Sequence, residues 1–137
     1  MCNQLSLPLK ESSSQTRRIL KFQLVSRRRV WGAEGLFVYC PVCEKAIKDA
    51  PDMHEILLTR GDFPKDMQYL IWSQYNCGLV HPECHPQAAT TTNQQKLVKA
   101  LVYHEGYDEV LNWLVGLEQY VKGTQVQQAV RLLESVK

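Results

Sequence analysis

The strongest constraint on this chain is a pair of short motifs that each hold two metal-binding side chains at the same spacing. The first is CPVC, with Cys40 and Cys43, and the second is HPEC, with His81 and Cys84. This spacing lets both side chains of a pair point from one tight turn, and Zn²⁺ prefers four cysteine or histidine ligands in a tetrahedron. The sequence therefore predicts one structural zinc site with Cys40, Cys43, His81 and Cys84 as its ligands.

The remaining cysteines do not enter this predicted site. Cys77 competes for the fourth position, but it lies in a short apolar stretch, where a free cysteine usually behaves as a small core residue. Cys2 lies in the polar N-terminal segment and receives no role. The alternative is that the two motifs hold only ordinary buried thiols and a surface histidine. Two pairs of equal spacing disfavour it.

The composition is that of an ordinary soluble globular protein of one domain. The chain has 137 residues, of which 45% are hydrophobic and 22% charged. No apolar run approaches the roughly 18 residues of a membrane span, and the N-terminus lacks the charged start and apolar middle of a secretory signal. We therefore expect a cytoplasmic protein without membrane contacts, whose reduced cysteines bind metal rather than form disulfides.

The sequence divides into three regions of different character. Residues 1–37 are basic, and Ser-rich near their start, and are predicted to form a partly disordered arm. Residues 38–92 contain both zinc motifs and short strand-like stretches, whereas residues 93–137 show the apolar periodicity of helices. Together the regions predict an α+β protein with a small zinc-stapled core, a basic N-terminal arm and a C-terminal helical tail.

Local patterns within these regions predict individual elements. Residues 17–31 mix cations with apolar residues and fit a strand or a short helix equally well. Asn93 is expected to cap a helix that Gly106 ends. Short strands are expected at 36–40, 53–59 and 76–81, a helical turn with Leu70 and Ile71 facing inward at 63–74, and further helices at 107–123 and 124–137.

Positive charge is concentrated in the N-terminal part of the chain. Residues 1–39 carry seven Lys or Arg and two Glu, whereas residues 40–137 carry nine Lys or Arg and twelve Asp or Glu. This asymmetry is typical of an arm that contacts nucleic-acid phosphates, although a solvated leader is the other interpretation. The residues expected to contact phosphates are Arg17, Arg18, Lys21, Arg27, Arg28 and Arg29.

Four polar residues remain close to the zinc motifs. His54 and Glu55 lie in MHEI, and Asn76 and His85 are the two ends of NCGLVHPECH. Together with CPVC before them, these motifs resemble the HNH (His-Asn-His, ββα-metal) nucleases over roughly residues 38–90. In that family a cysteine pair precedes a strand with a paired motif such as HH, DH or HE. An asparagine opens the next strand, and a histidine separated from it by eight residues begins a helix. The sequences of these motifs are especially similar to those of small phage and bacterial members.

The resemblance implies a catalytic role for each of the four residues. His54 and His85 would bind a catalytic Mg²⁺ or Mn²⁺ ion, Asn76 would tie the loop to the hairpin and orient the base, and Glu55 would be the general base. Most of the family has histidine where Glu55 stands. A carboxylate is a weaker base than imidazole and a good ligand for hard cations. The alternative therefore stays open that Glu55 binds the cation and His54 is the base. Pro86 is expected to shorten or displace the family's helix.

The resulting hypothesis is a small metal-dependent endonuclease that cuts one or both strands of DNA in a bacterial or phage-infected cell. One alternative is a zinc-stabilised DNA-binding protein without cleavage activity, which Glu55 and Pro86 favour. Another is an accessory protein of a packaging or recombination complex. Its helical tail would bind a partner protein or a second copy of the chain. His104, on an amphipathic helix, is expected to be a surface or packing residue.

Overall fold

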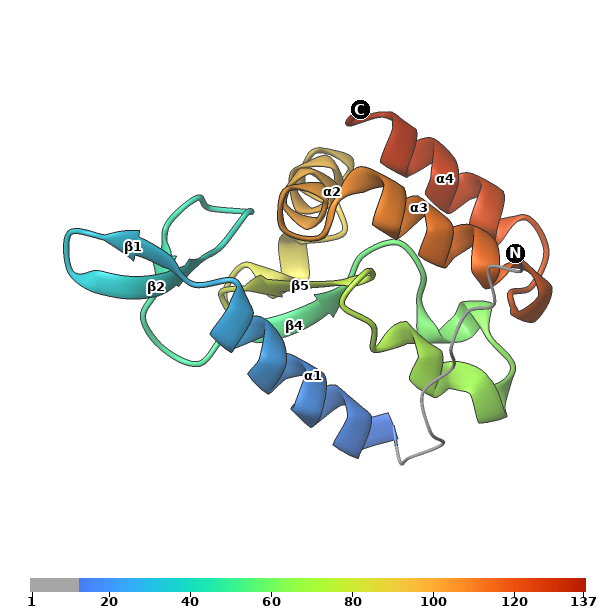
Figure 1. The fold of residues 1–137 in the computed structure, drawn as a ribbon, viewed down its shortest axis with the longest axis horizontal. Coiled ribbons are helices and arrows are strands. Elements are labelled where there is room, and N and C mark those ends of the chain that lie inside the picture. The colour runs from blue at the N-terminus through green and yellow to red at the C-terminus, as the bar shows by residue number, and fades with distance from the viewer. Residues whose placement is uncertain (1–12) are drawn as a thin grey trace.

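The computed structural model describes residues 13–137. Residues 1–12, which include Cys2 and the start of the predicted disordered arm, lie outside the described residues. The described chain combines helices with two small antiparallel sheets, in agreement with the predicted α+β class (Figure 1). The α-helices are α1 (Ser13–Arg27), α2 (Thr91–Glu105), α3 (Tyr107–Gly116) and α4 (Gln125–Glu134). The strands are β1 (Val30–Gly32), β2 (Gly35–Tyr39), β3 (Ala46–Ile47), β4 (Asp52–Glu55) and β5 (Cys77–Val80). The 3-10 helices are η1 (Arg60–Asp62), η2 (Lys65–Ile71), η3 (His85–Gln87) and η4 (Glu118–Tyr120).

The N-terminal cationic segment folds as helix α1, which resolves the choice between strand and helix. Leu20 and Leu24 lie four residues apart on one face of the helix, and both are buried. Phe22, between them, is 79% exposed. Helix α1 packs beside η2. The described part of the basic region, which was predicted to be partly disordered, is therefore helical from Ser13 to Arg27.

Strands β1 and β2 form a hairpin that extends away from the helices (Figure 1). Val30 pairs with Phe37 and Gly32 with Gly35, so two residues form the turn. Gly35 has a φ of +111°, a backbone conformation that L side chains rarely adopt. Strand β3 pairs with the far end of β2 and completes a three-stranded sheet, in which β2 is the strand expected at 36–40.

Strands β4 and β5 form a separate two-stranded sheet. All of β5 is buried, which accounts for its small and apolar side chains. Strand β4 is shorter than the strand predicted at 53–59 and ends at Glu55, because the backbone N–H groups that follow bond to the carbonyl and side chain of Asn76. In the connection between the strands, η2 buries Leu70 and Ile71, as predicted.

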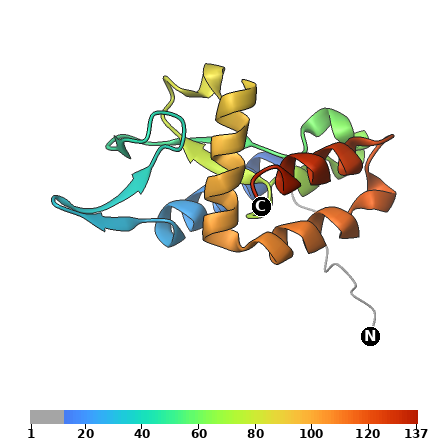
Figure 2. The ribbon, with the colours of Figure 1, turned by 90° about the horizontal axis from the view of Figure 1, so that it is seen from above.

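Helix α2 lies between the β1–β2 hairpin and the α3–α4 pair (Figure 2). Its N-cap is Thr90 rather than the predicted Asn93, because the Thr90 side chain accepts a hydrogen bond from the backbone N–H of Asn93. Gly106 ends the helix as predicted, with a φ of +94°. The helix expected at 107–123 is divided into α3 and η4 after Gly116, a residue that weakens helices.

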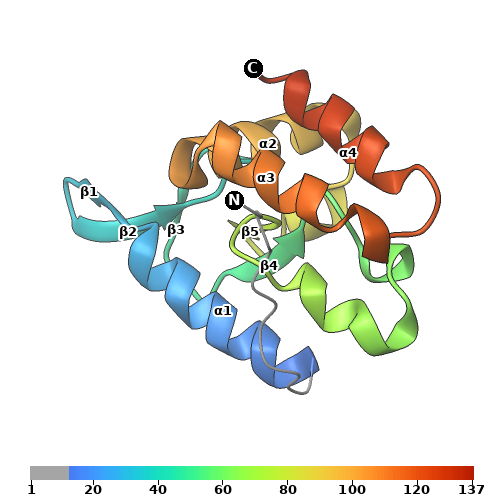
Figure 3. The same ribbon diagram turned by 45° about the vertical axis from the view of Figure 1, so that its right-hand side comes forward.

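Helices α3 and α4 pack side by side and run in opposite directions (Figure 3). Their contact faces bury Val110 and Leu114 of α3 and Val126 and Leu133 of α4. Within the part of the chain that the structure describes, no helix is both long and apolar enough to cross a membrane.

A buried ionic network joins the C-terminal ends of α1 and α2. Arg28 Nη2 donates to Glu105 Oε2 at 3.0 Å, and the two side chains are only 5% and 3% exposed. Arg28 also donates to the backbone oxygens of Cys77, at 2.7 Å, and Gln74, at 2.9 Å. Arg28 must therefore be removed from the predicted phosphate contacts, because its guanidinium is buried and bonded within the protein. Arg27 is 46% exposed and pairs with Glu105 at 3.0 Å.

Replacing Glu105 by alanine is expected to lower the free energy of unfolding by about 3–5 kcal/mol, because it leaves the charge of Arg28 buried without its partner. Urea denaturation followed by circular dichroism measures this change. The matched control, Glu134→Ala, removes an exposed carboxylate from α4 and should stay within about 0.5 kcal/mol of the unsubstituted protein. A Glu105→Ala loss as small as that of the control would show that the network does not stabilise the fold.

Candidate metal centre and histidine cavity

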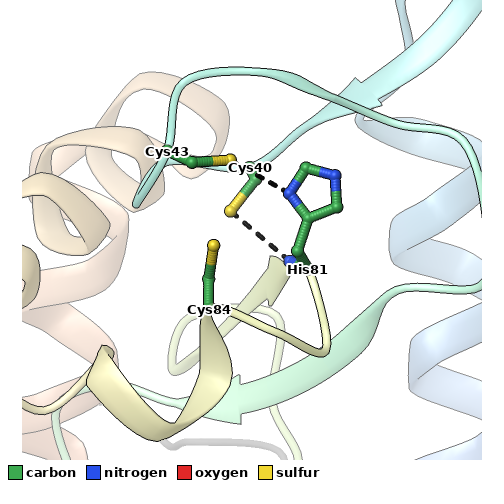
Figure 4. A group of neighbouring side chains, drawn as sticks. All are labelled: Cys40, Cys43, His81 and Cys84. Carbon is green, nitrogen blue, oxygen red and sulfur yellow. Dashed lines mark hydrogen bonds between the residues drawn. The ribbon is translucent and has the colours of Figure 1, made fainter.

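The four predicted zinc ligands come together from two turns. Cys40 follows β2 and Cys43 precedes β3, whereas His81 follows β5 and Cys84 precedes η3. One ligand atom from each side chain lies within 4.8 Å of each of the others (Figure 4). Zinc–sulfur bonds of about 2.3 Å set tetrahedral ligands roughly 3.8 Å apart, so small movements would close the site. The cluster could therefore hold a metal ion such as zinc, for which three thiols and an imidazole are a preferred donor set.

Hydrogen bonds orient His81 for this role. Its Nε2 lies 3.1 Å from the carbonyl oxygen of Ala46, which can only accept, so Nε2 carries the ring proton. The other ring nitrogen, Nδ1, is then unprotonated and faces Cys43 Sγ at 3.0 Å (Figure 4). A carbonyl bonded to the outer nitrogen commonly sets the tautomer of a metal-binding histidine. Nδ1 is therefore the nitrogen that His81 offers to a metal.

The backbone around the first motif favours the thiolate of Cys40. Burial acts to raise the pKa of this thiol, but hydrogen bonds from the backbone of Cys43, His81 and Val42 outweigh it and lower the pKa to about 7. The turn places Glu44 at a φ of 62°, with its N–H bonded to the Cys40 carbonyl oxygen at 2.7 Å. Because the thiolate is the form that binds metal, the fold prepares Cys40 for coordination.

Cys77 lies outside the cluster, as the sequence analysis expected. It is fully buried, and its Sγ donates to the carbonyl oxygen of Ile71 at 3.4 Å. Burial raises the pKa of this thiol to about 12, so it stays neutral and behaves as a core residue. Across residues 13–137, no second group of three or more His, Cys, Asp or Glu side chains meets the same distance criterion for holding a metal.

Asn76 ties the segment after β4 to the start of β5. Its Oδ1 accepts from the backbone N–H groups of Leu57 and Leu58, both at 2.9 Å. Its Nδ2 donates to the carbonyl oxygens of Leu58, at 2.8 Å, and Ile71, at 3.1 Å. The side chain is fully buried, and these four bonds use both of its donors and both acceptor positions. Asn76 thus holds the loop, and backbone groups fill its hydrogen-bonding capacity, which leaves none for orienting a catalytic base.

His54 and His85 converge from separate elements. His54 lies on β4 and His85 opens η3, and their ring centroids are 5.2 Å apart with the planes at 82°. Asp52 Oδ2 lies 3.0 Å from His85 Nδ1. Asp52 comes two residues before His54 on the same strand, and therefore shares its face. Because the carboxylate occupies Nδ1, the Nε2 nitrogen of His85 is left for another ligand.

Pro86 displaces the following helix, as expected. His85 begins the single 3-10 turn η3, and the next α-helix, α2, begins only at Thr91. Proline fits this turn because it stands at one of the first positions, where its missing N–H breaks no internal hydrogen bond. His85 is therefore held by a short turn and by Asp52 rather than by a long helix.

His54 is neutral at neutral pH. Burial lowers its pKa below the usual value of 6.5, the neighbouring His85 lowers it further, and Glu55 partly opposes both effects. A neutral imidazole can bind a metal or accept a proton. His54 is thus chemically able to fill either of the two roles that the sequence left open.

The two histidines line a cavity of about 400 Å³ that has positive charge at its rim. Arg17 of α1 and Arg60 of η1 also line it, and their guanidinium carbons lie 5.6 and 6.0 Å from the ring centroid of Trp72. Glu55 belongs to the same cavity, and its carboxylate lies 4.0 Å from Arg60 Nε. Guanidinium groups beside imidazoles and a carboxylate suit an anionic ligand such as a phosphate.

Two residues of this site, Asp52 and Arg60, were missed in the sequence analysis. Asp52 had a usable signal, because two residues that are two apart on a strand lie on the same face. No signal in the sequence indicated Arg60, since its position depends on how the loop after β4 folds back. Of the predicted phosphate contacts, Arg17 reaches the cavity, while Arg18 and Arg29 are exposed and Lys21 is partly buried on or just after α1.

Comparisons of the chain with protein-family models, with curated proteins and with solved structures found no match.

The purified protein is expected to contain a single zinc ion per chain, and Cys43→Ala should abolish zinc binding, because the remaining three ligands do not complete a tetrahedral site. Metal analysis by mass spectrometry measures the zinc content, and circular dichroism reports the fold. We expect the variant to lose ordered structure as well, since zinc binding contributes to the folding free energy.

Cys77→Ala is the control for this prediction. It removes a buried thiol that lies outside the cluster, so the protein should be less stable but should retain its zinc. Equal loss of zinc in both variants would contradict the assignment of ligands.

Asn76→Ala is expected to lower the free energy of unfolding by about 3–5 kcal/mol, because two backbone N–H groups and two backbone carbonyls lose their buried partner. Chemical denaturation at neutral pH provides the measurement. Asn112→Ala on α3, where the asparagine is exposed, is the matched control and should change stability by no more than about 0.5 kcal/mol. If the two variants were equally stable, Asn76 would not be the tie that holds the loop.

Proposed function

We propose that this chain is a metal-dependent endonuclease of the HNH type that hydrolyses phosphodiester bonds of DNA, with zinc as its structural metal. The observation that carries the proposal is the convergence of His54 and His85 on one cavity whose rim holds Arg17 and Arg60. The order of β4, β5 and the following helix supports it further. It is the order of the ββα unit that the sequence resemblance implies.

Two features of the histidine pair support a role in binding a catalytic cation. His54 is neutral at neutral pH because burial lowers its pKa, and His85 has Asp52 bonded to Nδ1, which leaves Nε2 for a ligand. When bound there, Mg²⁺ or Mn²⁺ would polarise a phosphate oxygen and stabilise the departing 3′ oxygen. The two imidazoles would fill only part of the coordination shell, in keeping with the open sites of cations that also bind substrate phosphates.

The other residues of the cavity have complementary roles in this proposal. Glu55 would accept the proton of the attacking water through its carboxylate. Arg17 and Arg60 would bind the phosphate oxygens and position the scissile bond, which arginine does better than lysine because its fork matches phosphate geometry. Asn76 would position the loop after β4, and through it Arg60.

A second candidate is a zinc-stabilised DNA-binding protein that does not cleave DNA. The observation that favours it is the small number of metal ligands in the cavity. His54 and His85 supply two, and among residues 13–137 no third His, Cys, Asp or Glu joins them in a group at metal-binding distance. The arginine-rimmed cavity would then bind a phosphate without activating water.

The test is a plasmid nicking assay on the zinc-loaded protein with added Mg²⁺ or Mn²⁺. Conversion of supercoiled to nicked or linear plasmid is expected, and His54→Ala should slow it by at least about 100-fold, because a group that acts on the reacting atoms is lost. Glu55→Gln should have a similar effect if Glu55 is the base, and a much smaller one if His54 is.

The matched control for Glu55→Gln is Glu134→Gln, which removes an exposed carboxylate of α4 and should cleave at the unsubstituted rate. Unchanged zinc content and circular dichroism establish that His54→Ala is folded. If the zinc-loaded protein binds plasmid but cuts none of its forms, the second candidate replaces the first.

A further inference from the structure

A second concave surface lies between the β1–β2 hairpin and helix α2, and shares no lining residue with the histidine cavity. This groove has a volume of about 860 Å³. The hairpin forms one wall and α2 the other, and Pro41 and Glu44 of the CPVC turn contribute to its lining between them. Figure 2 shows the hairpin extending on the side of α2 that faces away from α3 and α4.

Exposed aromatic rings line both walls of the groove. Trp31 of β1 and Tyr103 of α2 are each 79% exposed. Tyr39 of β2 is 50% exposed and also contributes to the lining, but the strand register places it on the face of the hairpin opposite to Trp31. The ring of Tyr39 is held by an edge-to-face contact with Phe37 at 5.0 Å between centroids. Large rings are usually buried, so the exposed rings of Trp31 and Tyr103 on the two walls of one groove indicate a surface that binds a ligand with flat faces.

Positive charge accompanies these rings. Lys96, Lys99 and Tyr103 lie three and four residues apart along α2, which places them on one face of the helix, and all three line the groove. Lys99 is exposed, while Lys96 also donates to the backbone oxygen of Val42 at 3.3 Å. Glu44 is the carboxylate in the lining. The two lysine charges exceed this single negative charge, so the groove favours an anionic ligand.

We propose that this groove binds an unpaired DNA strand, with bases stacked on Trp31 and Tyr103 and phosphates beside Lys96 and Lys99. Aromatic platforms next to a positively charged track are the features with which proteins hold single strands, because every base has a face that can stack and every nucleotide carries a charge. The bases of a duplex are already stacked on one another and cannot lie against these rings.

The composition of the groove favours nucleic acid over a protein partner. The cores of protein interfaces are depleted in lysine, whereas here two lysines lie beside an exposed ring on the same helix face. The choice of DNA over RNA rests on the proposed function, in which DNA is the substrate of the histidine cavity. Strand binding itself does not depend on cleavage, because the two surfaces use different residues.

Fluorescence anisotropy of a labelled oligothymidylate tests the proposal, with the full-length zinc-loaded protein and no added divalent metal. Trp31→Ala and Tyr103→Ala should each weaken binding by about tenfold or more, because each removes one stacking platform. Trp31→Phe should restore most of the affinity. Lys99→Gln should reduce the slope of log affinity against log salt by about 0.7, the value for one phosphate contact on a single strand.

Phe22→Ala is the matched control, because Phe22 is also 79% exposed but lies on α1 outside the groove. It should bind the oligonucleotide as the unsubstituted protein does. Because the binding assay contains no added divalent metal, it measures strand binding without cleavage, so a failed cleavage assay and a failed binding assay are separate results.

Three outcomes would overturn the proposal. Undiminished binding by Trp31→Ala and Tyr103→Ala would show that the strand lies elsewhere. Equal competition by duplex DNA would show that charge rather than stacking drives binding, and stronger binding of the matching oligoribonucleotide would overturn the assignment to DNA.

Discussion

The rest of the fold depends on the contact between the two turns that carry the Cys40–Cys43 and His81–Cys84 pairs. The three-stranded sheet and the β4–β5 sheet share no strand, and both consist of strands of two to five residues, which are too short to be stable alone. Cys40 and Cys43 follow the first sheet's central strand, whereas His81 and Cys84 follow β5. A metal held by all four would join the sheets at one point, and thereby place the hairpin beside α2 and His85 beside β4.

Buried polar contacts connect further segments of the fold. Asn76 connects the loop after β4 to the strand that leads into HPEC, and Glu105 connects α2 to Arg28 at the end of α1. Each of these side chains joins segments that are distant in sequence, and each is satisfied entirely within the protein. The cavity depends on both, because Arg60 lies on the loop that Asn76 holds and Arg17 lies on the helix that Arg28 anchors.

The features that the sequence predicted correctly are encoded locally. The paired spacing of the four ligands, the short apolar run of β5 and the helix stop at Gly106 each need only a few neighbouring residues to be recognised. The features it missed depend on distant partners. Arg28 looks like its neighbours Arg27 and Arg29 until Glu105, far along the chain, is placed against it. Likewise, Asp52 acquires a role only once the chain returns through β5 and brings His85 opposite.

The Cys3His cluster and the histidine cavity are joined through one peptide bond. Cys84 belongs to the cluster, and the next residue, His85, lines the cavity. A chelator that removed the structural ion would release the turn that carries His85, and would disturb the cavity even if no ion were bound there. Under the proposed function, inhibition by a chelator would therefore report on two metals at once. Returning zinc first and Mg²⁺ second would separate recovery of the turn from recovery of cleavage.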